Sequence, residues 1–374
     1  MLVIVGLIAV YSASFAVGEL EYNSPYYFIA RQAIWAVVGT GLLIFFMRTD
    51  YHQLRNLSPL LMLAALAGLA AVLVPELGVN RNGASRWIAL GPLPPIQPSE
   101  FAKLALVIYV SAWLSAKSRD LSSFATGLVP FVTMVGLVAG LVMLEPDMGT
   151  SIIIILTTIT LFFVAGGALS HLMALISIGG VTSAFLVVTG GYRADRIFAF
   201  VSPEADPAGK GFHILQLLIA LGSGGLTGLG VGASRQKFFY VPGAHTDGIF
   251  AIIGEEMGFI GAIAVLLLFA LLIYRGVRVM LNAPDNFGSL LALGITSWIG
   301  YQTIINIGGI TRSLPLTGIP LPFLSYGGSA LAATMAGTGI LLSVSRYSKG
   351  HVAARELNPA SARRAKRRMT EDTI

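Results

Sequence analysis

Long apolar runs constrain this chain more than any other feature. LVIVGLIAVYSASFAV, LMLAALAGLAAVLVP and IGAIAVLLLFALLIY are each close to the roughly 20 residues that a helix needs to cross a bilayer. Only 11% of the residues are charged and 55% are hydrophobic, whereas about 25% are charged in a typical soluble domain. A soluble chain could not bury so much apolar surface, so the sequence predicts an all-α polytopic membrane protein.

The apolar pattern predicts about ten transmembrane helices. The first run has no basic segment before it, as a cleaved signal peptide would, so we interpret it as a retained helix. The chain contains no cysteine, which excludes disulfides, thiol catalysis and thiolate metal sites. The predicted spans are residues 1–17, 27–47, 57–75, 100–116, 124–144, 149–166, 170–190, 250–274, 288–310 and 327–345.

Basic residues in the short loops predict the orientation. Lysine or arginine follows spans two, four and eight, and the C-terminal segment contains RRAKRR at 363–368. These positions fall on one side of the membrane, and basic loops favour the cytosolic side. We therefore expect both termini in the cytosol, a transmembrane domain over 1–345 and a basic tail over 346–374. A basic tail after a last span is typical of contact with anionic lipid, so the net charge of +6 does not indicate nucleic-acid binding.

One long segment, residues 191–249, is expected outside the cytosol between spans seven and eight. It contains the apolar, glycine-rich stretch GFHILQLLIALGSGGLTGLGVG. Backbone this irregular must be buried in protein or line a wet cavity, and we expect an interfacial or re-entrant helix followed by glycine turns. No strand precedes GSGGLTGLG, so the sequence does not indicate a dinucleotide site.

Several cations lie on the side where topology does not favour them, which suggests an anionic ligand. Paired guanidinium groups suit phosphate or pyrophosphate recognition. Membrane-interface anchoring is the alternative for the arginines, and snorkelling is the alternative for a lysine inside a span. The candidate residues are Arg86, Lys103, Arg193, Arg196 and Lys237.

Acidic residues gather on the same side. Glu100 suits the opening turn of span four, where a negative charge meets the helix dipole. Asp147 either caps span six or belongs to a site. In YVPGAHTDGIFAIIGEEMG, Thr246 or Asp247 would make a good N-cap for span eight.

Two further stretches predict walls of the same site. Acids at membrane depth normally face a cavity or a partner, which applies to Glu255 and Glu256. The proline- and glycine-rich stretch 306–346, which includes Ser325, is expected to form another wall.

Taken together, these motifs resemble one family. GASRWIALGP, IQPSEFAKL, EPDMGTS, YRADRIFAF, DPAGKGFH, RQKFFYVPGAHTD and LPLTGIPLPFLSYGGSA occur across nearly the whole chain, and the chain looks like a SEDS protein (shape, elongation, division and sporulation). RQKFFYVP before HTD is more similar to the division-type FtsW than to the elongation-type RodA.

The resemblance implies a ten-helix peptidoglycan glycosyltransferase of the bacterial cytoplasmic membrane. Such an enzyme polymerises lipid II into glycan strands on the outer face. It works with a class B penicillin-binding protein and other divisome or elongasome membrane proteins. The rival interpretations are a flippase or ion-coupled transporter, with its charges at the midplane in broken helices, and a non-catalytic scaffold.

The resemblance also singles out Asp247 as the functionally critical acid. We expect Asp247 to act as general base on the attacking hydroxyl, with His245 as a weaker candidate or an orienting neighbour. The cations would stabilise the departing pyrophosphate. The sequence requires no cofactor and shows no metal signature, although a divalent cation could share the pyrophosphate. The family usually has PEAHTDFIFA where this chain has Gly243 and Gly248.

Overall fold

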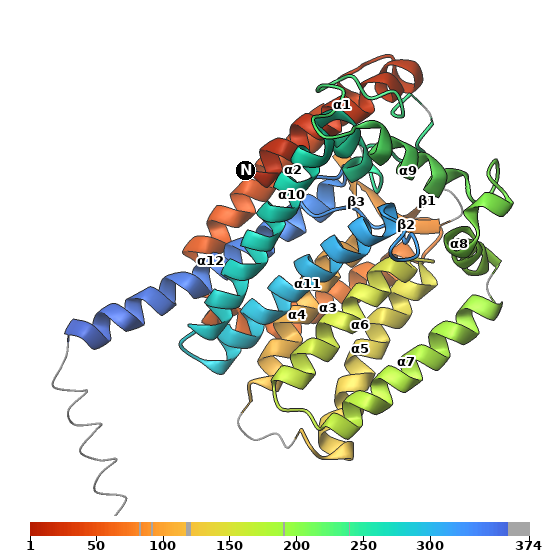
Figure 1. The fold of residues 1–374 in the computed structure, drawn as a ribbon. Coiled ribbons are helices and arrows are strands. Elements are labelled where there is room, and N and C mark those ends of the chain that lie inside the picture. The colour runs from red at the N-terminus through yellow and green to blue at the C-terminus, as the bar shows by residue number, and fades with distance from the viewer. Residues whose placement is uncertain (82–83, 91–92, 117–120, 190, 239, 358–374) are drawn as a thin grey trace, which may run out of the picture.

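The protein is a helical bundle with one small sheet, seen here in a computed structural model (Figure 1). The structure describes residues 1–374 except 82–83, 91–92, 117–120, 190, 239 and 358–374. The helices are α1 (Leu2–Tyr22), α2 (Tyr27–Arg48), α3 (His52–Val72), α4 (Pro98–Leu114), α5 (Val129–Leu144), α6 (Met148–Val164), α7 (Leu169–Thr189), α8 (Gly191–Val201), α9 (Phe212–Ser223), α10 (Ile249–Leu281), α11 (Asn286–Ile310) and α12 (Gly328–Leu357), and the strands are β1 (Gly78–Arg81), β2 (Ala84–Leu90) and β3 (Leu93–Ile96).

The helices agree with the expectation of a multi-pass membrane protein. Each of the ten predicted spans falls on one of the helices α1–α7 and α10–α12. Within the described residues, seven helical segments are long and apolar enough to cross a membrane, whereas α6 and the described part of α7 are shorter apolar helices and α4 has 17 residues. The exact count of ten crossings stays a prediction.

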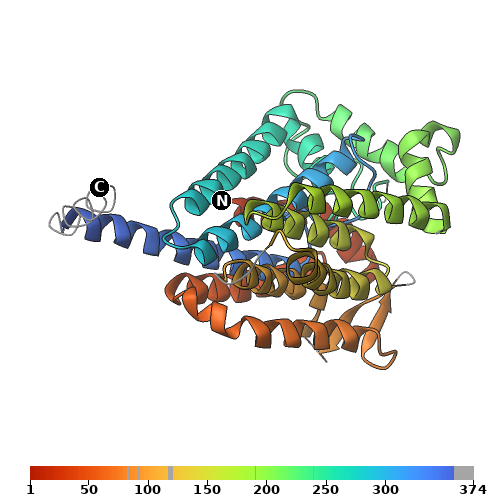
Figure 2. The ribbon, with the colours of Figure 1, turned by 90° about the horizontal axis from the view of Figure 1, so that it is seen from below.

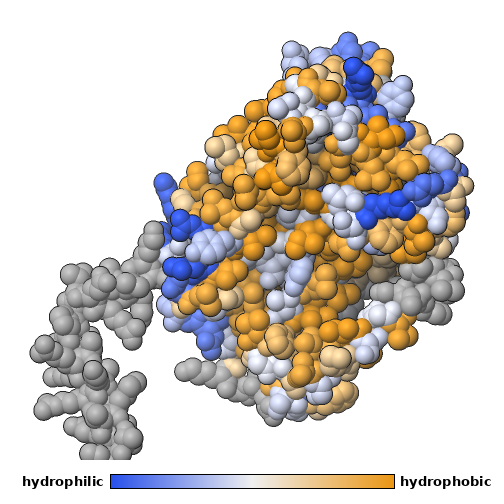
Figure 3. Space-filling view, viewed as in Figure 1, coloured by the Kyte–Doolittle hydropathy of each residue, from blue (hydrophilic) through white to orange (hydrophobic). Residues whose placement is uncertain are grey.

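The bundle has a buried centre and an apolar outside. In α11 and α12, 78% of the most apolar stretch is buried, whereas in α2, α3 and α10 only 22% is buried. The outer helices therefore expose isoleucine, leucine, valine and phenylalanine over broad areas (Figure 3). Exposed apolar surface of this extent requires an apolar surrounding, which lipid tails provide.

The basic turns meet at one end of the bundle. Arg346 on α12 donates to the Arg48 carbonyl at the end of α2, and Ser343 donates to the Thr49 carbonyl over 2.6 Å. Tyr51 donates to Asp285 in the turn between α10 and α11. Figure 2 shows α12 continuing beyond the bundle on this side. The segment RRAKRR lies outside the described residues.

A small sheet corrects the purely helical expectation. Residues 78–96 form three antiparallel strands in the order β1-β2-β3, with Gly78 opposite Ile88 and Ile88 opposite Ile96. The strands are short and β3 contains two prolines, so the sequence pattern for a sheet was not visible. The sheet continues directly into α4, where Pro98 takes the first helical position as predicted.

The described part of the segment 191–249 contains the α-helices α8 and α9, a short 3-10 helix between them (Pro203–Ala205) and the expected glycine turns. The glycine turns dock on α10, whose backbone is non-helical at Gly258 (φ 66°, ψ −167°). Leu229 N donates to the Glu255 carbonyl over 3.0 Å, and Phe259 N donates to the Gly225 carbonyl over 2.9 Å. The backbone groups freed by the break in α10 are thus paired with protein rather than left in lipid.

Glycine at position 228 is required by this docking. Its φ is +83°, and an added Cβ would overlap the Glu256 carbonyl oxygen. We therefore expect Gly228→Ala to destabilise the protein by about 1–3 kcal/mol, measured as a lower midpoint of thermal unfolding in detergent. Gly140→Ala is the control, because a Cβ at Gly140 meets nothing within 4 Å. Equal midpoints for the two variants would contradict the docking.

Candidate active site

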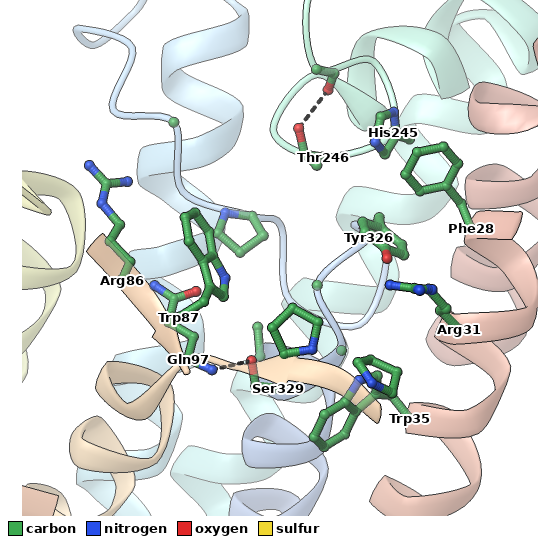
Figure 4. Close-up of a pocket in the computed structure, with 18 of the residues that line it drawn as sticks. Phe28, Arg31, Trp35, Arg86, Trp87, Gln97, His245, Thr246, Tyr326 and Ser329 are labelled. Atoms are coloured by element: carbon green, nitrogen blue, oxygen red, sulfur yellow. Dashed lines mark hydrogen bonds between the residues drawn. The ribbon is translucent and has the colours of Figure 1, made fainter. Parts of the chain in front are cut away.

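A large cavity opens between α1, α2, the sheet, the loop before α10 and the segment before α12. It has a volume of about 930 Å³ and is lined by both polar and aromatic side chains. Figure 4 shows Arg31 and Trp35 entering from α2, Trp87 from β2, and His245 and Tyr326 from the two loops. We call this space the large cavity. It gathers residues from five distant parts of the chain at one end of the bundle.

Asp247 lies on a second, smaller space. This small pocket has a volume of about 180 Å³ and is lined by Asp247, Arg196, His213 and Lys210, among others. Gly318 lines both spaces. An added Cβ at Gly318 would lie 3.4 Å from an Arg196 nitrogen and 3.6 Å from an Asp247 oxygen. The two spaces therefore adjoin at Gly318, next to the Asp247 carboxylate.

A tight turn holds Asp247 in place. Thr246 N and Gly248 N both donate to the Gly243 carbonyl, over 2.9 and 3.1 Å. Gly243 has φ +65°, and an added Cβ would lie 2.5 Å from an Asp247 oxygen. Glycine at position 243 therefore allows the positive φ of the turn and leaves room for the Asp247 carboxylate. Asn306, which sequence reasoning missed, ties the turn to the next segment by donating to the Asp247 carbonyl.

The expected N-cap of α10 is wrong. Gly248 occupies the cap position, and no side chain accepts a hydrogen bond there. The Asp247 carboxylate instead accepts from the Thr246 hydroxyl over 3.0 Å. The carboxylate therefore faces the small pocket beside Arg196 rather than the helix end. Asp247 is therefore free of a capping role.

Arg196 and Arg193 belong to α8. The Arg196 guanidinium donates to the carbonyls of Leu316 and Thr317. These contacts fix its position on the wall of the small pocket, next to Asp247. The side chain of Arg193 lies outside the described residues, so its predicted role stays a prediction.

Lys237 is buried in an ion pair. Its ammonium group donates to Glu256 over 2.9 Å, to the Ser12 hydroxyl over 3.2 Å and to the Gly232 carbonyl over 2.6 Å. Its side chain is 0% exposed. Three protein acceptors therefore occupy the three donors of the ammonium group. This geometry favours a structural role for Lys237 over the predicted contact with pyrophosphate.

Glu255 and Glu256 face protein partners, as acids at membrane depth were expected to do. Glu256 pairs with Lys237 and accepts from Ser12 over 2.6 Å. Glu255 accepts from the Ser234 hydroxyl and from Arg235 N. Together these bonds fasten the loop before Asp247 to α1 and α10.

Lys103 is also buried and paired. Its ammonium group donates to Glu100 over 3.0 Å and to Gln302 over 2.9 Å, and it lies 5.1 Å from the centre of the Trp298 ring. Gln302 in turn donates to the Pro320 carbonyl over 2.8 Å. Lys103 therefore connects α4 with α11 and the wall of the large cavity. Glu100 lines that cavity and occupies the first turn of α4, as predicted.

Arg86 and Asp147 meet at the turn between α5 and α6. Asp147 caps α6 by accepting from Thr150 N over 3.0 Å, which confirms the predicted cap. It also lines the large cavity, so both predicted roles are compatible. The Arg86 guanidinium donates to the carbonyls of Glu145 and Pro146. Burial, reinforced by Asp147 and opposed by Arg86, raises the pKa of Glu145 to about 8.

His245 and Ser325 shape the loops around the large cavity. The His245 ring lies 4.5 Å from the Phe28 ring and 5.6 Å from the Tyr326 ring, between centres. Burial lowers the pKa of His245 to about 4. The imidazole is therefore neutral at pH 7 and packs between aromatic rings. The Ser325 hydroxyl accepts from Leu321 N over 2.8 Å and so closes the turn before α12.

The structure also adds residues that sequence reasoning did not select. Arg31, Trp35, Trp87 and Tyr326 line the large cavity. Each looked like an ordinary anchor or packing residue in an apolar stretch. Only the spacing of Tyr27, Arg31 and Trp35 could have indicated a common helix face. Among the described residues, no three His, Cys, Asp or Glu side chains are grouped as a metal site would require.

Comparison with known proteins now adds an independent observation. The family model of the FtsW, RodA and SpoVE cell cycle proteins matches residues 1–350. The chain belongs to this family. The match continues to residue 350 in α12, so it includes both the large cavity and the small pocket.

Individual relatives match over nearly their whole length. The chain is 45% identical over 349 residues to stage V sporulation protein E of Bacillus subtilis, covering 93% of this chain and 95% of that protein. It is 39% identical over 345 residues to a probable peptidoglycan glycosyltransferase FtsW of Geobacter metallireducens, covering 92% of each. These names confirm the resemblance to the family and to FtsW, and they add a sporulation protein that the sequence analysis had not named.

Solved structures of the family have the same fold. A chain from a peptidoglycan synthase complex that coordinates polymerization and crosslinking matches with a TM-score of 0.73 and 28% identity, covering 92% of this chain and 97% of that chain. RodA of Thermus thermophilus matches with a TM-score of 0.63 and 28% identity, covering 91% and 94%. The FtsW/RodA/SpoVE fold therefore extends through the whole transmembrane part.

The buried pair predicts a stability effect. Lys237→Met removes the charge but leaves Glu256 buried, which should cost about 3–5 kcal/mol. Lys210→Met is the control, because Lys210 pairs with Asp195 with half of its side chain exposed, and it should leave the unfolding midpoint close to that of the wild type. Thermal unfolding in detergent measures both.

A second variant separates pairing from packing. Lys237→Met combined with Glu256→Gln removes both charges, and it should recover part of the lost stability. If Lys237→Met were as stable as the wild type and only weakened substrate binding, the structural role of Lys237 would be wrong.

The low pKa of His245 predicts a pH dependence of stability. In the unfolded chain the imidazole titrates near its ordinary pKa of about 6.5, whereas in the fold it titrates near 4. The contribution of the neutral ring is therefore present above about pH 6.5 and is lost as the pH falls towards 4. By pH 5 the loss is about 2 kcal/mol.

His245→Phe tests this dependence because it keeps a ring beside Phe28 and removes the titration. Between pH 7 and pH 5, the unfolding midpoint of the wild type should fall more steeply than that of the variant. Parallel curves for the two proteins would show that His245 does not set this dependence.

Proposed function

We propose that this chain is a peptidoglycan glycosyltransferase that polymerises lipid II into glycan strands, in cell division or in the determination of cell shape. The observation that carries the proposal is full-length similarity to relatives named as probable peptidoglycan glycosyltransferases, at 39% identity. The large cavity next to Asp247 supports it, because a lipid-linked disaccharide needs a roomy site.

Asp247 is the proposed general base. In an inverting transfer, the hydroxyl oxygen of the acceptor sugar attacks the anomeric carbon of the donor, and its proton goes to the Asp247 carboxylate. The new glycosidic bond forms as the bond between the anomeric carbon and the diphosphate breaks, and the lipid diphosphate leaves with the bonding electrons. The position of Asp247 beside Arg196 supports this assignment.

Arg196 is the proposed partner of the leaving group. Its guanidinium group is held by two carbonyls on the wall of the small pocket. A preorganised cation at the place where negative charge develops stabilises the transition state. We also propose that a divalent cation shares the diphosphate with Arg196, and polymerisation in the presence of a chelator tests this.

The proposed orientation places the large cavity on the outer face of the bacterial cytoplasmic membrane. Its support is the cluster of basic turns at the other end of the bundle, after α2, after α10 and at the end of α12. Basic loops favour the cytosolic side. With ten crossings, both termini would lie in the cytosol.

The proposed partner is a class B penicillin-binding protein, which would crosslink the new strands. The peptidoglycan synthase complex with the similar chain coordinates polymerization and crosslinking, and this supports such a pairing. Lipid II and the nascent glycan strand are the proposed ligands, and other divisome or elongasome membrane proteins are the proposed neighbours.

Transport of a lipid-linked precursor is the alternative. The break in α10 at Gly258 is the feature that a transporter would have. However, the freed backbone groups pair with residues 225–230, and the adjacent Glu256 pairs with Lys237. Within the described residues, these backbone groups at the break and the Glu256 carboxylate are therefore already paired with protein, which favours the glycosyltransferase.

Asp247→Asn tests the proposed function. The substitution keeps the size of the side chain and removes the base, so lipid II polymerisation by the purified protein with its penicillin-binding protein should fall by about 10²–10⁴-fold. The unfolding midpoint should stay close to that of the wild type. Glycan products separated on a gel measure the activity.

Asp50→Asn is the matched control, because Asp50 lies at the other end of the bundle and is hydrogen bonded to His52. It should keep wild-type polymerisation. Polymerisation by Asp247→Asn at the wild-type rate would refute the assignment of the base. A wild-type protein that forms no polymer with any class B partner would refute the function itself.

A further inference from the structure

One face of α2 is directed into the large cavity. Tyr27, Arg31 and Trp35 are spaced by four residues, so they lie above one another on one side of the helix. All three line the cavity. Figure 4 shows Arg31 extending from α2 toward Tyr326, with Trp35 below it. No motif of the sequence had selected this face.

The rotation of α2 is fixed by contacts on either side of Arg31. Gln32 is 1% exposed, and it donates to the Ser325 carbonyl over 3.1 Å and accepts from Gly327 N over 3.2 Å. Trp35 packs on the start of α12, where an added Cβ at Gly328 would overlap its ring. These contacts of Gln32 and Trp35 prevent α2 from rotating about its axis, and Arg31 is therefore held toward the cavity.

Arg31 differs from the other cations of this region. The ammonium groups of Lys103 and Lys237 are occupied by carboxylates, and the guanidinium of Arg86 is occupied by two carbonyls. The Arg31 guanidinium lies over the Tyr27 ring, 4.3 Å from its centre. In the part of the chain that the structure describes, no carboxylate or carbonyl accepts a hydrogen bond from Arg31.

A cation in this position calls for an anionic ligand. Charged groups at membrane depth normally pair with a partner or face a site. A guanidinium group presents a planar set of donors that matches phosphate oxygens. The aromatic ring beneath Arg31 holds the group in place and leaves its outer donors directed at the cavity.

The place of Arg31 relative to Asp247 decides which diphosphate it would bind. In the proposed reaction, both the donor and the acceptor are lipid diphosphates. The leaving diphosphate must lie close to the attacking hydroxyl, and therefore close to Asp247 and Arg196 in the small pocket. The acceptor diphosphate lies at the far end of its disaccharide. Arg31 lines the large cavity and not the small pocket.

We propose that Arg31 binds the diphosphate of the lipid-linked acceptor. This inference rests on the proposed glycosyltransferase function and assigns each diphosphate its own arginine. Arg31 contacts a group whose charge does not change during the reaction. It therefore contributes to binding of the acceptor and leaves the chemical step unchanged.

Kinetics with lipid II test this assignment. Arg31→Gln should raise KM for lipid II by about tenfold to a hundredfold, with kcat within about threefold of the wild type. Arg31→Lys keeps the charge but not the planar set of donors, so its KM should lie between the two. Arg48→Gln, on the same helix at the other end, should keep both constants of the wild type.

A binding measurement makes the result independent of turnover. Undecaprenyl diphosphate is added to the Asp247→Asn protein in lipid nanodiscs, with and without Arg31→Gln, and the quenching of tryptophan fluorescence reports binding near Trp35 and Trp87. Arg31→Gln should weaken binding by about tenfold or more. Undecaprenyl phosphate has one phosphate fewer. It should bind less tightly than undecaprenyl diphosphate to the Asp247→Asn protein that keeps Arg31, and Arg31→Gln should reduce its affinity by a smaller factor.

The outcomes separate this inference from the proposed function. If wild-type protein forms no polymer, the function fails, whereas the binding measurement still tests Arg31. If Arg31→Gln keeps the wild-type KM and affinity, the inference is overturned. If it lowers kcat and leaves KM unchanged, Arg31 acts on the leaving group, and the assignment to the acceptor is wrong. If Arg31→Gln does not fold, the KM and kcat of Arg31→Lys are compared with those of the wild type instead. An unchanged KM for Arg31→Lys would then overturn the inference.

Discussion

The buried pair of Lys237 and Glu256 is the interaction on which the site depends most. It joins three parts of the chain, because Ser12 of α1 bonds to both charged groups. An ion taken out of water is costly unless its partners compensate it. Here the ammonium group has three acceptors, and Glu256 has a cation and a hydroxyl. The loop from Lys237 to Asp247 is therefore fixed at both ends. The ion pair holds its start, and the turn at Gly243 holds its end.

The same constraint explains why the site is built from irregular backbone. At membrane depth, each unpaired backbone group costs free energy. The glycine turns 225–230 pair with the break in α10, and Asn306 and Gln302 hold the segment before α12 through carbonyl oxygens. Protein takes the place of water around each loop. The two spaces on either side of Gly318 can therefore keep a fixed shape next to lipid.

The sequence predicted local features well. The spans followed from apolar runs, and the cap at Asp147 and the start of α4 at Pro98 followed from spacing within one turn. The partners of Lys103 and Lys237 could not be predicted, because Gln302 and Ser12 are about 200 residues away in the chain. Arg31 was missed for the same reason, since only the folded cavity distinguishes it from a membrane anchor.

The break at Gly258 divides α10 into two parts with different surroundings. Before the break, the helix is buried and begins directly after Asp247, whereas many of the residues after it are exposed to the lipid side. Since the glycine turns hold the first part in place, its position does not depend on how the second part meets the bilayer. Changes of side chain that adapt the outer part to a thicker or thinner membrane can accumulate there without moving the carboxylate.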